Sequence, residues 1–162
     1  MEQIKKNLPE SVYHRLKNVA RKQKRPVQEV LQYFAMERFL YRLSISPYQS
    51  SFFLKGGLML TVWSPQDHRA TVDIDLLART SNQPENLRNI ITEICSINTI
   101  PDGIRFVTDP LLIKETQIDN EYQGLNASFT AELFTARCIY ALTLALAIQY
   151  FLSLLHSSIR SY

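Results

Sequence analysis

Two segments decide the fold of this chain: FFLKGG at residues 52–57 and HRATVDIDL at residues 68–76. In the second segment apolar and polar residues alternate, which is the period-2 pattern of a half-buried strand. Asp73 and Asp75 are therefore expected on one face, about 7 Å apart along the strand. Gly56 and Gly57 end the first segment, and a backbone without side chains can approach another group closely. Together the segments predict a glycine turn facing a strand that carries two acids.

These two features together favour a particular chemistry. Two carboxylates on one face repel each other in a cleft of low dielectric constant, and a divalent cation relieves that repulsion. Mg²⁺ typically keeps waters and substrate phosphates beside one or two carboxylates, and the N–H groups of a glycine turn suit phosphate oxygens. Taken separately, Asp-x-Asp is most often a solvated sheet face and Gly-Gly is most often a turn. In this order they predict a nucleotide and Mg²⁺ site.

The same residues resemble nucleotidyltransferases of the polymerase-β-like superfamily, which carry a hydrophobic residue, Gly-Gly or Gly-Ser, and an acidic-x-acidic pair on a neighbouring strand. More narrowly, LKGG at 54–57 with RATVDIDL at 69–76 resembles the AbiEii/AbiGii-type nucleotidyltransferase toxins of toxin–antitoxin and phage-defence systems. The resemblance runs from about residue 8 to residue 137. It includes three further segments: RFLYRLS at 38–44, DGIRF at 102–106 and EYQGL at 121–125.

The resemblance implies transfer of NMP from an NTP to an acceptor such as RNA or tRNA, and a cognate antitoxin as partner. It implies that Asp73 and Asp75 are the catalytic residues and bind Mg²⁺. It also implies that Gly56 and Gly57 cradle the triphosphate. A second hypothesis, from another class, is a non-catalytic module that binds nucleotide or protein through a degenerate nucleotidyltransferase fold.

Two cations beside these segments are candidate nucleotide-binding residues. Lys55 is either a phosphate contact or a solvated residue at a strand end, and the sequence leaves both open. Arg69 lies on the same predicted face as Asp73, where a cation offsets carboxylate or phosphate charge, so we expect it to bind nucleotide. Thr71 is expected to be a supporting hydroxyl rather than a ligand.

Hydrophobic periodicity predicts one α/β (α+β) domain, a mixed sheet with flanking helices and a helical N-terminus. Helices are expected from Leu8, from Pro26 to about Leu43, over 58–63 and over 85–96. Strands are expected at 51–55, 69–78, 104–107, about 111–117 and 125–133.

Composition sets only broad limits. The net charge of +3 and the pI of about 8.9 permit a nucleic-acid partner without arguing for one. The basic run RKQKR at 21–25 either closes the first helix or contacts nucleic acid. Cys95 and Cys138 predict neither a disulfide framework nor a zinc site. The first residues lack an apolar h-region, so we expect a cytoplasmic protein with no membrane partner.

The end of the chain departs from the family pattern. In related toxins the corresponding stretch continues into Asp-Ile-Gly-Phe-Gly-Asp, whose first Asp supplies a third carboxylate. Here no charged residue occurs from Cys138 to Leu155. Three hypotheses follow: a transmembrane segment, a buried strand and helix, or translation in a shifted reading frame. We prefer the third, because codons permitted for CIYALTLALAIQ at 138–149, taken two bases later, encode HICIDIGFGDT.

A frameshift would divide the chain in two. Residues 1–137 would be the N-terminal part of a nucleotidyltransferase-fold domain, and residues 138–162 would be an aberrant hydrophobic tail, with the C-terminal part of the fold missing. The third carboxylate would then be absent. Since phosphoryl transfer depends on charge stabilisation and positioning, its loss predicts weak or absent activity.

Overall fold

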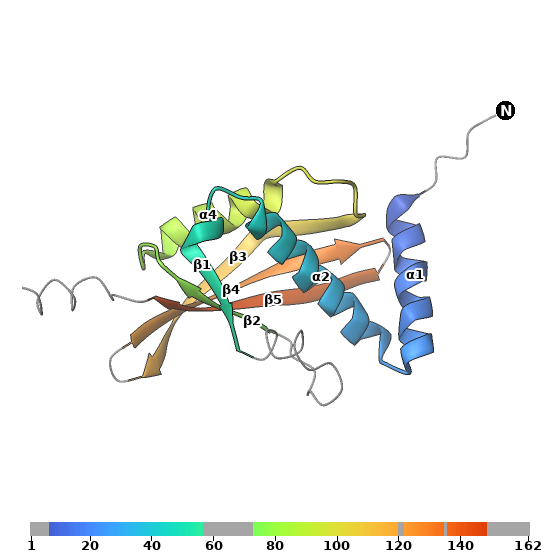
Figure 1. The fold of residues 1–162 in the computed structure, drawn as a ribbon, viewed down its shortest axis with the longest axis horizontal. Coiled ribbons are helices and arrows are strands. Elements are labelled where there is room, and N and C mark those ends of the chain that lie inside the picture. The colour runs from blue at the N-terminus through green and yellow to red at the C-terminus, as the bar shows by residue number, and fades with distance from the viewer. Residues whose placement is uncertain (1–6, 57–72, 120–121, 135, 149–162) are drawn as a thin grey trace, which may run out of the picture.

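The structure is a computed structural model that describes residues 7–56, 73–119, 122–134 and 136–148. Within these residues it contains three α-helices, one 3-10 helix and one five-stranded sheet (Figure 1). In chain order the elements are α1 (Leu8–Gln23), α2 (Val27–Ser44), η1 (Gln49–Ser51), β1 (Phe52–Lys55), β2 (Asp73–Ala78), α4 (Pro84–Ser96), β3 (Ile104–Asp119), β4 (Tyr122–Leu133) and β5 (Ala136–Ile148). The predicted mixed α/β class with a helical N-terminus is confirmed.

α1 begins and ends where its sequence signals place the caps. The side chain of Asn7 accepts a hydrogen bond from the backbone N–H of Glu10 at 3.4 Å, which satisfies one of the free donors of the first turn. Lys24 ends the helix in the left-handed conformation, at φ 54°. Val12 packs with Leu31 of α2 and Leu133 of β4, so α1 stands against the second helix and one end of the sheet (Figure 1).

The sheet order is β1-β2-β5-β4-β3, with β2 parallel to β5 and the other pairs antiparallel. β5 therefore lies in the middle of the sheet. Of the three hypotheses for the end of the chain, a strand matches the structure over residues 138–148, and the predicted boundary after Arg137 falls inside β5. No helix in the described ranges is long and apolar enough to cross a membrane. The frameshift stays a prediction.

β3 corrects one expectation. The segments 104–107 and about 111–117 were expected as two strands, but they form one strand paired with β4 along its length. The pairing register shifts between Val107 and Leu112, and the Asp109-Pro110 peptide lies within that shift. An irregularity of this kind accommodates a proline that cannot donate to the ladder, so the sheet continues through it.

α2 and α4 cover one face of the sheet (Figure 1). The predicted inner stripe of α4 is fully buried there, namely Leu87, Ile90, Ile91 and Ile94. Three rings from α2, β3 and β4 pack with centroids 5.4–6.1 Å apart: Phe39, Phe106 and Phe129. The main hydrophobic core therefore lies between α2, α4 and one face of the sheet.

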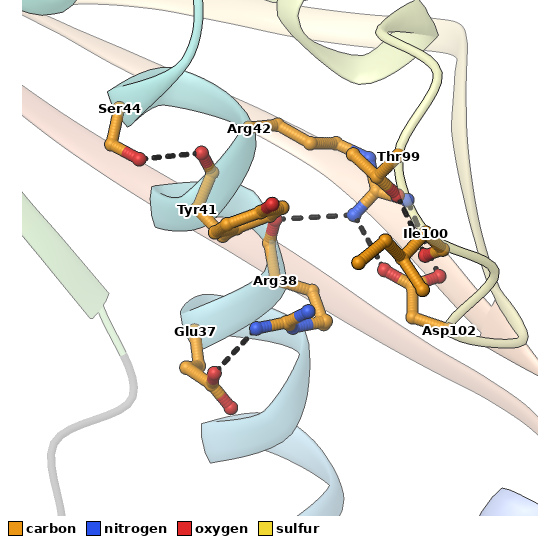
Figure 2. Close-up of polar contacts among 8 residues, drawn as sticks. All are labelled: Glu37, Arg38, Tyr41, Arg42, Ser44, Thr99, Ile100 and Asp102. Atoms are coloured by element: carbon orange, nitrogen blue, oxygen red, sulfur yellow. Dashed lines mark hydrogen bonds and ion pairs between the residues drawn. The ribbon is translucent and has the colours of Figure 1, made fainter.

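A buried ion pair ties α2 to the loop that leads into β3 (Figure 2). Arg42 donates to both carboxylate oxygens of Asp102, at 3.0 and 3.3 Å, and its side chain is only 7% exposed. Asp102 also accepts from the backbone N–H of Ile104 at 3.2 Å, and the Arg42 guanidinium lies over the Phe106 ring. The pair fixes the start of β3 against the helix.

Candidate active site

The two predicted acids lie on the side of β2 that faces away from the helices. Along β2 the burial alternates: Ile74, Leu76 and Ala78 are buried in the core, whereas Asp73 and Asp75 are half-exposed. Side chains two residues apart in a strand point the same way, so both carboxylates share one face. The predicted alternation is confirmed over the described part of the strand. Residues 69–72, the predicted first half, lie outside the described residues.

The end of β1 brings a glycine against this face. Lys55 pairs with Asp75 across the antiparallel ladder, and Gly56 follows at φ 74°, a conformation that favours glycine. A β-carbon built on Gly56 would overlap Oδ2 of Asp75 and lie 3.1 Å from its Cβ. The carboxylate of Asp75 therefore packs directly against the α-carbon of Gly56. The acid and the glycine turn are in contact, so the predicted turn does face the strand that carries the acids.

Of the other predicted site residues, the structure describes Lys55 but not Gly57 or Arg69. Lys55 is half-buried at the end of β1, and as the register partner of Asp75 it belongs to the same face. Gly57 directly follows Gly56, but it lies outside the described residues. Arg69 and Thr71 also lie outside them, as does the predicted helix at 58–63. The described site thus consists of Asp73, Asp75, Gly56 and Lys55.

On the side of β2 away from β1, the neighbouring strand is β5. Its register pairs Thr143 with Asp73 and Ala145 with Asp75. Between Ala136 and Ile148 the sequence contains no Asp or Glu, so β5 contributes no carboxylate beside the pair. In the described part of the chain no group of three or more His, Cys, Asp or Glu side chains is placed to hold a metal ion. Two carboxylates still fit Mg²⁺, which accepts waters and substrate phosphates as its remaining ligands.

Comparison with protein families identifies the chain. The model of the nucleotidyl transferase AbiEii toxin family of type IV toxin–antitoxin systems matches residues 38–148. The chain belongs to this family. The AbiEii match includes the last part of α2, every described strand and the two acids of the site. A search of curated proteins gives no match.

AbiEii membership makes the chain a nucleotidyltransferase toxin at the level of the family. It implies an NTP substrate and an antitoxin partner. The match ends at residue 148, beyond the predicted limit of the resemblance at residue 137, and it begins in α2, so α1 lies outside it.

Sequence analysis did not identify one set of polar residues that lies on the same face of the sheet as Asp73 and Asp75. Asn126 of β4 pairs with Ala145, and Lys114 of β3 pairs with Asn126, so the register row through Asp75 continues across the sheet. Along β4 the residues 126, 128, 130 and 132 are polar, while the buried positions between them are apolar. That alternation is visible in the sequence. The register row that joins β4 to Asp75 could be recognised only once the position of β5 between β2 and β4 was known.

Proposed function

We propose that this face transfers a nucleoside monophosphate from an NTP to an acceptor hydroxyl, with Mg²⁺ held by Asp73 and Asp75. The contact between the Asp75 carboxylate and the α-carbon of Gly56 carries the proposal, because a phosphate at the glycine turn would lie beside that carboxylate. Because the phosphate and the Asp75 carboxylate are both negatively charged, their proximity is unfavourable without a cation between them. An NTP that binds together with its divalent ion supplies that cation.

Each residue of the site has a role in this reaction. Gly56 and Gly57 would bind phosphate oxygens through backbone N–H groups, and Lys55 and Arg69 would pair with phosphate charge. Asp73 and Asp75 would bind Mg²⁺, with one ion to activate the acceptor hydroxyl and another to neutralise the leaving pyrophosphate. The acceptor oxygen bonds to the α-phosphorus, the bond to pyrophosphate breaks, and the hydroxyl proton is released. RNA such as tRNA is the proposed acceptor.

We further propose that this chain is weakly active or inactive as a transferase. β5 has Thr143 and Ala145 at the register positions of Asp73 and Asp75, so this strand supplies no third carboxylate to the site. In the shifted reading frame, the first Asp of the Asp-Ile-Gly-Phe-Gly-Asp motif spans the codons of Leu142 and Thr143. That position is the register partner of Asp73. We therefore retain the proposal that residues 138–162 are an out-of-frame tail, and an encoding DNA without the motif in the shifted frame would refute it.

Mg²⁺-dependent incorporation of labelled NTP into bulk tRNA tests the transferase. The wild-type chain, Asp73→Asn and Asp75→Asn are compared, with Asp109→Asn as a matched change of an exposed acid on β3. We expect weak incorporation that both site substitutions abolish and that Asp109→Asn leaves unchanged. Incorporation that survives Asp73→Asn would exclude the proposed role of that acid, and robust transfer by the wild-type chain would overturn the prediction of weak activity.

The second candidate is a binding module that retains the fold without the chemistry. The absence of acids from β5 between Ala136 and Ile148 favours it. NTP binding by the wild-type chain and by Asp73→Asn, without incorporation by either, would support this candidate over the transferase.

A further inference from the structure

The positive charge of the chain is concentrated at its N-terminal end. Residues 1–25 contain eight Lys and Arg against two Glu, whereas residues 26–162 contain ten Lys and Arg against thirteen Asp and Glu. The modest overall charge therefore conceals a basic segment joined to an acidic remainder. Charge asymmetry of this kind is typical of proteins that bind a polyanion.

The structure gathers six of these cations on α1 and the turn after it. We define this set as the basic face; its members are Arg15, Lys17, Arg21, Lys22, Lys24 and Arg25, and all six are exposed. The opposite side of α1 is anchored in the core by Val12 and Ala20. No acidic residue occurs between Glu10 and Glu29. The helix thus presents its cations outward over about 10 Å of its length, from Arg15 to Lys22.

Neutralisation within the fold does not account for the basic face. Among the described residues only Arg25 has a carboxylate partner, Glu29, at 3.2 Å. Arg21 donates to the amide oxygen of Asn18 at 2.9 Å, and Lys17 lies 5.6 Å from the centroid of the Tyr13 ring. The negative end of the helix dipole favours cations only in the last turn, and Arg15 and Lys17 lie before that turn. Arg15 Nε donates to the backbone oxygen of Ser11 at 3.4 Å, which leaves its charge without a carboxylate among the described residues.

We propose that the basic face binds the phosphate backbone of an RNA. The inference rests on the proposed function, since this RNA would be the acceptor or part of it. α1 lies outside the residues that the AbiEii family model matches, so the family does not assign this surface. In Figure 1 the C-terminal ends of α1 and β1 both point to the lower edge of the view. A polynucleotide on that side would pass the end of the helix and the end of β1.

RNA suits this surface better than a membrane does. Helices that lie on membranes pair a basic face with exposed aromatic or aliphatic residues that enter the lipid. The apolar side of α1 instead packs on α2 and β4 through Val12, Leu16 and Leu133. The basic face can therefore attract a ligand by its positive charge, which is how proteins bind the phosphate backbone of nucleic acids.

The test measures RNA binding without NTP or Mg²⁺, by fluorescence anisotropy of a labelled 20-nucleotide single strand and of tRNA over a range of KCl. Lys17→Gln/Lys22→Gln removes two exposed charges without breaking an ion pair among the described residues. Lys17→Arg/Lys22→Arg keeps the charge, and Arg79→Gln/Arg88→Gln removes the same charge far along the sequence. Circular dichroism confirms that each variant is folded.

If each lost phosphate contact lowers the salt slope by about 0.7, the Lys-to-Gln variant should bind single-stranded RNA about 25-fold more weakly at 0.1 M salt. The slope of log Kd against log salt should fall by about 1.4. The Lys-to-Arg variant should stay within about twofold of wild type and the Arg79/Arg88 variant should lose much less. An equal loss in that control, an unchanged Kd in the Lys-to-Gln variant, or binding to vesicles containing phosphatidylserine without RNA binding would overturn the proposal.

Two further results separate this inference from the proposed function. Asp73→Asn should bind RNA like wild type, because the acid lies on β2 and not on α1. NMP transfer to another acceptor, without RNA binding that depends on α1, would refute only the proposal that the basic face binds RNA. RNA binding that depends on α1, without NMP transfer, would refute only the proposal that the site is a transferase.

Discussion

The carboxylate of Asp75 occupies the space in which any side chain at position 56 would lie. Gly56 is thus required twice, for its φ of 74° and for the room it leaves to Asp75. Gly56, which directly follows β1, and Asp75 of β2 are in contact although they are not register partners. The glycine and the acid therefore act as one unit of the site.

Gly56→Ala should lower the free energy of unfolding by about 1–3 kcal/mol, because alanine at positive φ is strained and its methyl group overlaps Asp75 Oδ2. It should also displace the Asp75 carboxylate and reduce NTP binding. Urea denaturation followed by circular dichroism measures the first effect, and titration with an NTP measures the second.

A double-mutant cycle separates strain from overlap. In an Asp75→Ala background the carboxylate is gone, so Gly56→Ala should cost less than it does in the wild-type chain. Equal costs in both backgrounds would mean that the overlap with Asp75 contributes nothing.

Thr143→Asp should increase Mg²⁺-dependent transfer, since Thr143 is the register partner of Asp73 and a carboxylate there would complete the metal site. We expect at least a tenfold gain in NMP incorporation, which corresponds to about 1.4 kcal/mol of transition-state stabilisation. The melting temperature of the variant should also rise on addition of Mg²⁺, more than that of the wild-type chain.

The matched control for this gain is Leu144→Asp. Leu144 pairs with Ile74, which is fully buried in the core, so an acid there should destabilise the fold without any gain in transfer. A similar response of both variants to Mg²⁺ would show that the position in the register is irrelevant.

Asp102→Ala should lower the free energy of unfolding by about 3–5 kcal/mol, because it leaves the buried Arg42 guanidinium without its partner. Arg105→Ala is the control, since it breaks an ion pair with Glu132 in which the arginine side chain is 72% exposed, and it should cost about 1 kcal/mol or less. Urea denaturation measures both. Similar losses of unfolding free energy in the two variants would contradict the prediction that the buried ion pair matters more for stability than the exposed one.

The Cys95 thiol should be unreactive in the folded chain. Burial raises its pKa from 9.0 to about 12, while the charge of Arg42 opposes that shift. At pH 8 the thiolate fraction should therefore be about a thousandfold lower than in the unfolded chain. Labelling of a Cys138→Ser variant with a thiol reagent, with and without urea, measures the difference. Equal rates in the two conditions would refute the prediction.

The same shift has a consequence for stability. The folded state favours the neutral thiol, so the stabilisation is fully present below pH 9 and is lost as the pH rises toward 12. The melting temperature should fall less steeply over pH 9–11 in a Cys95→Ala variant than in the wild-type chain.

Several elements were predictable because their signals are local. The stripe Leu87, Ile90, Ile91 and Ile94 placed α4 correctly, and the alternation around Asp73 and Asp75 placed both acids on one face. The break at Asp109-Pro110 was misleading, since pairing with β4 carries β3 through it. The ion pair between Arg42 and Asp102 joins residues sixty positions apart, and no periodicity reveals such a contact.

Local patterns were enough to predict the three described α-helices, the face of β2 that carries the acids, the glycine turn and the resemblance to the toxin family, because each depends on residues close together in the chain. That residues 136–148 lie between β2 and β4, and that Thr143 lies beside Asp73, became clear from the folded chain alone. An apolar run suits a central strand, a helix or a membrane span equally well. Hydrogen bonding to two neighbouring strands, which depends on distant parts of the chain, selects among them.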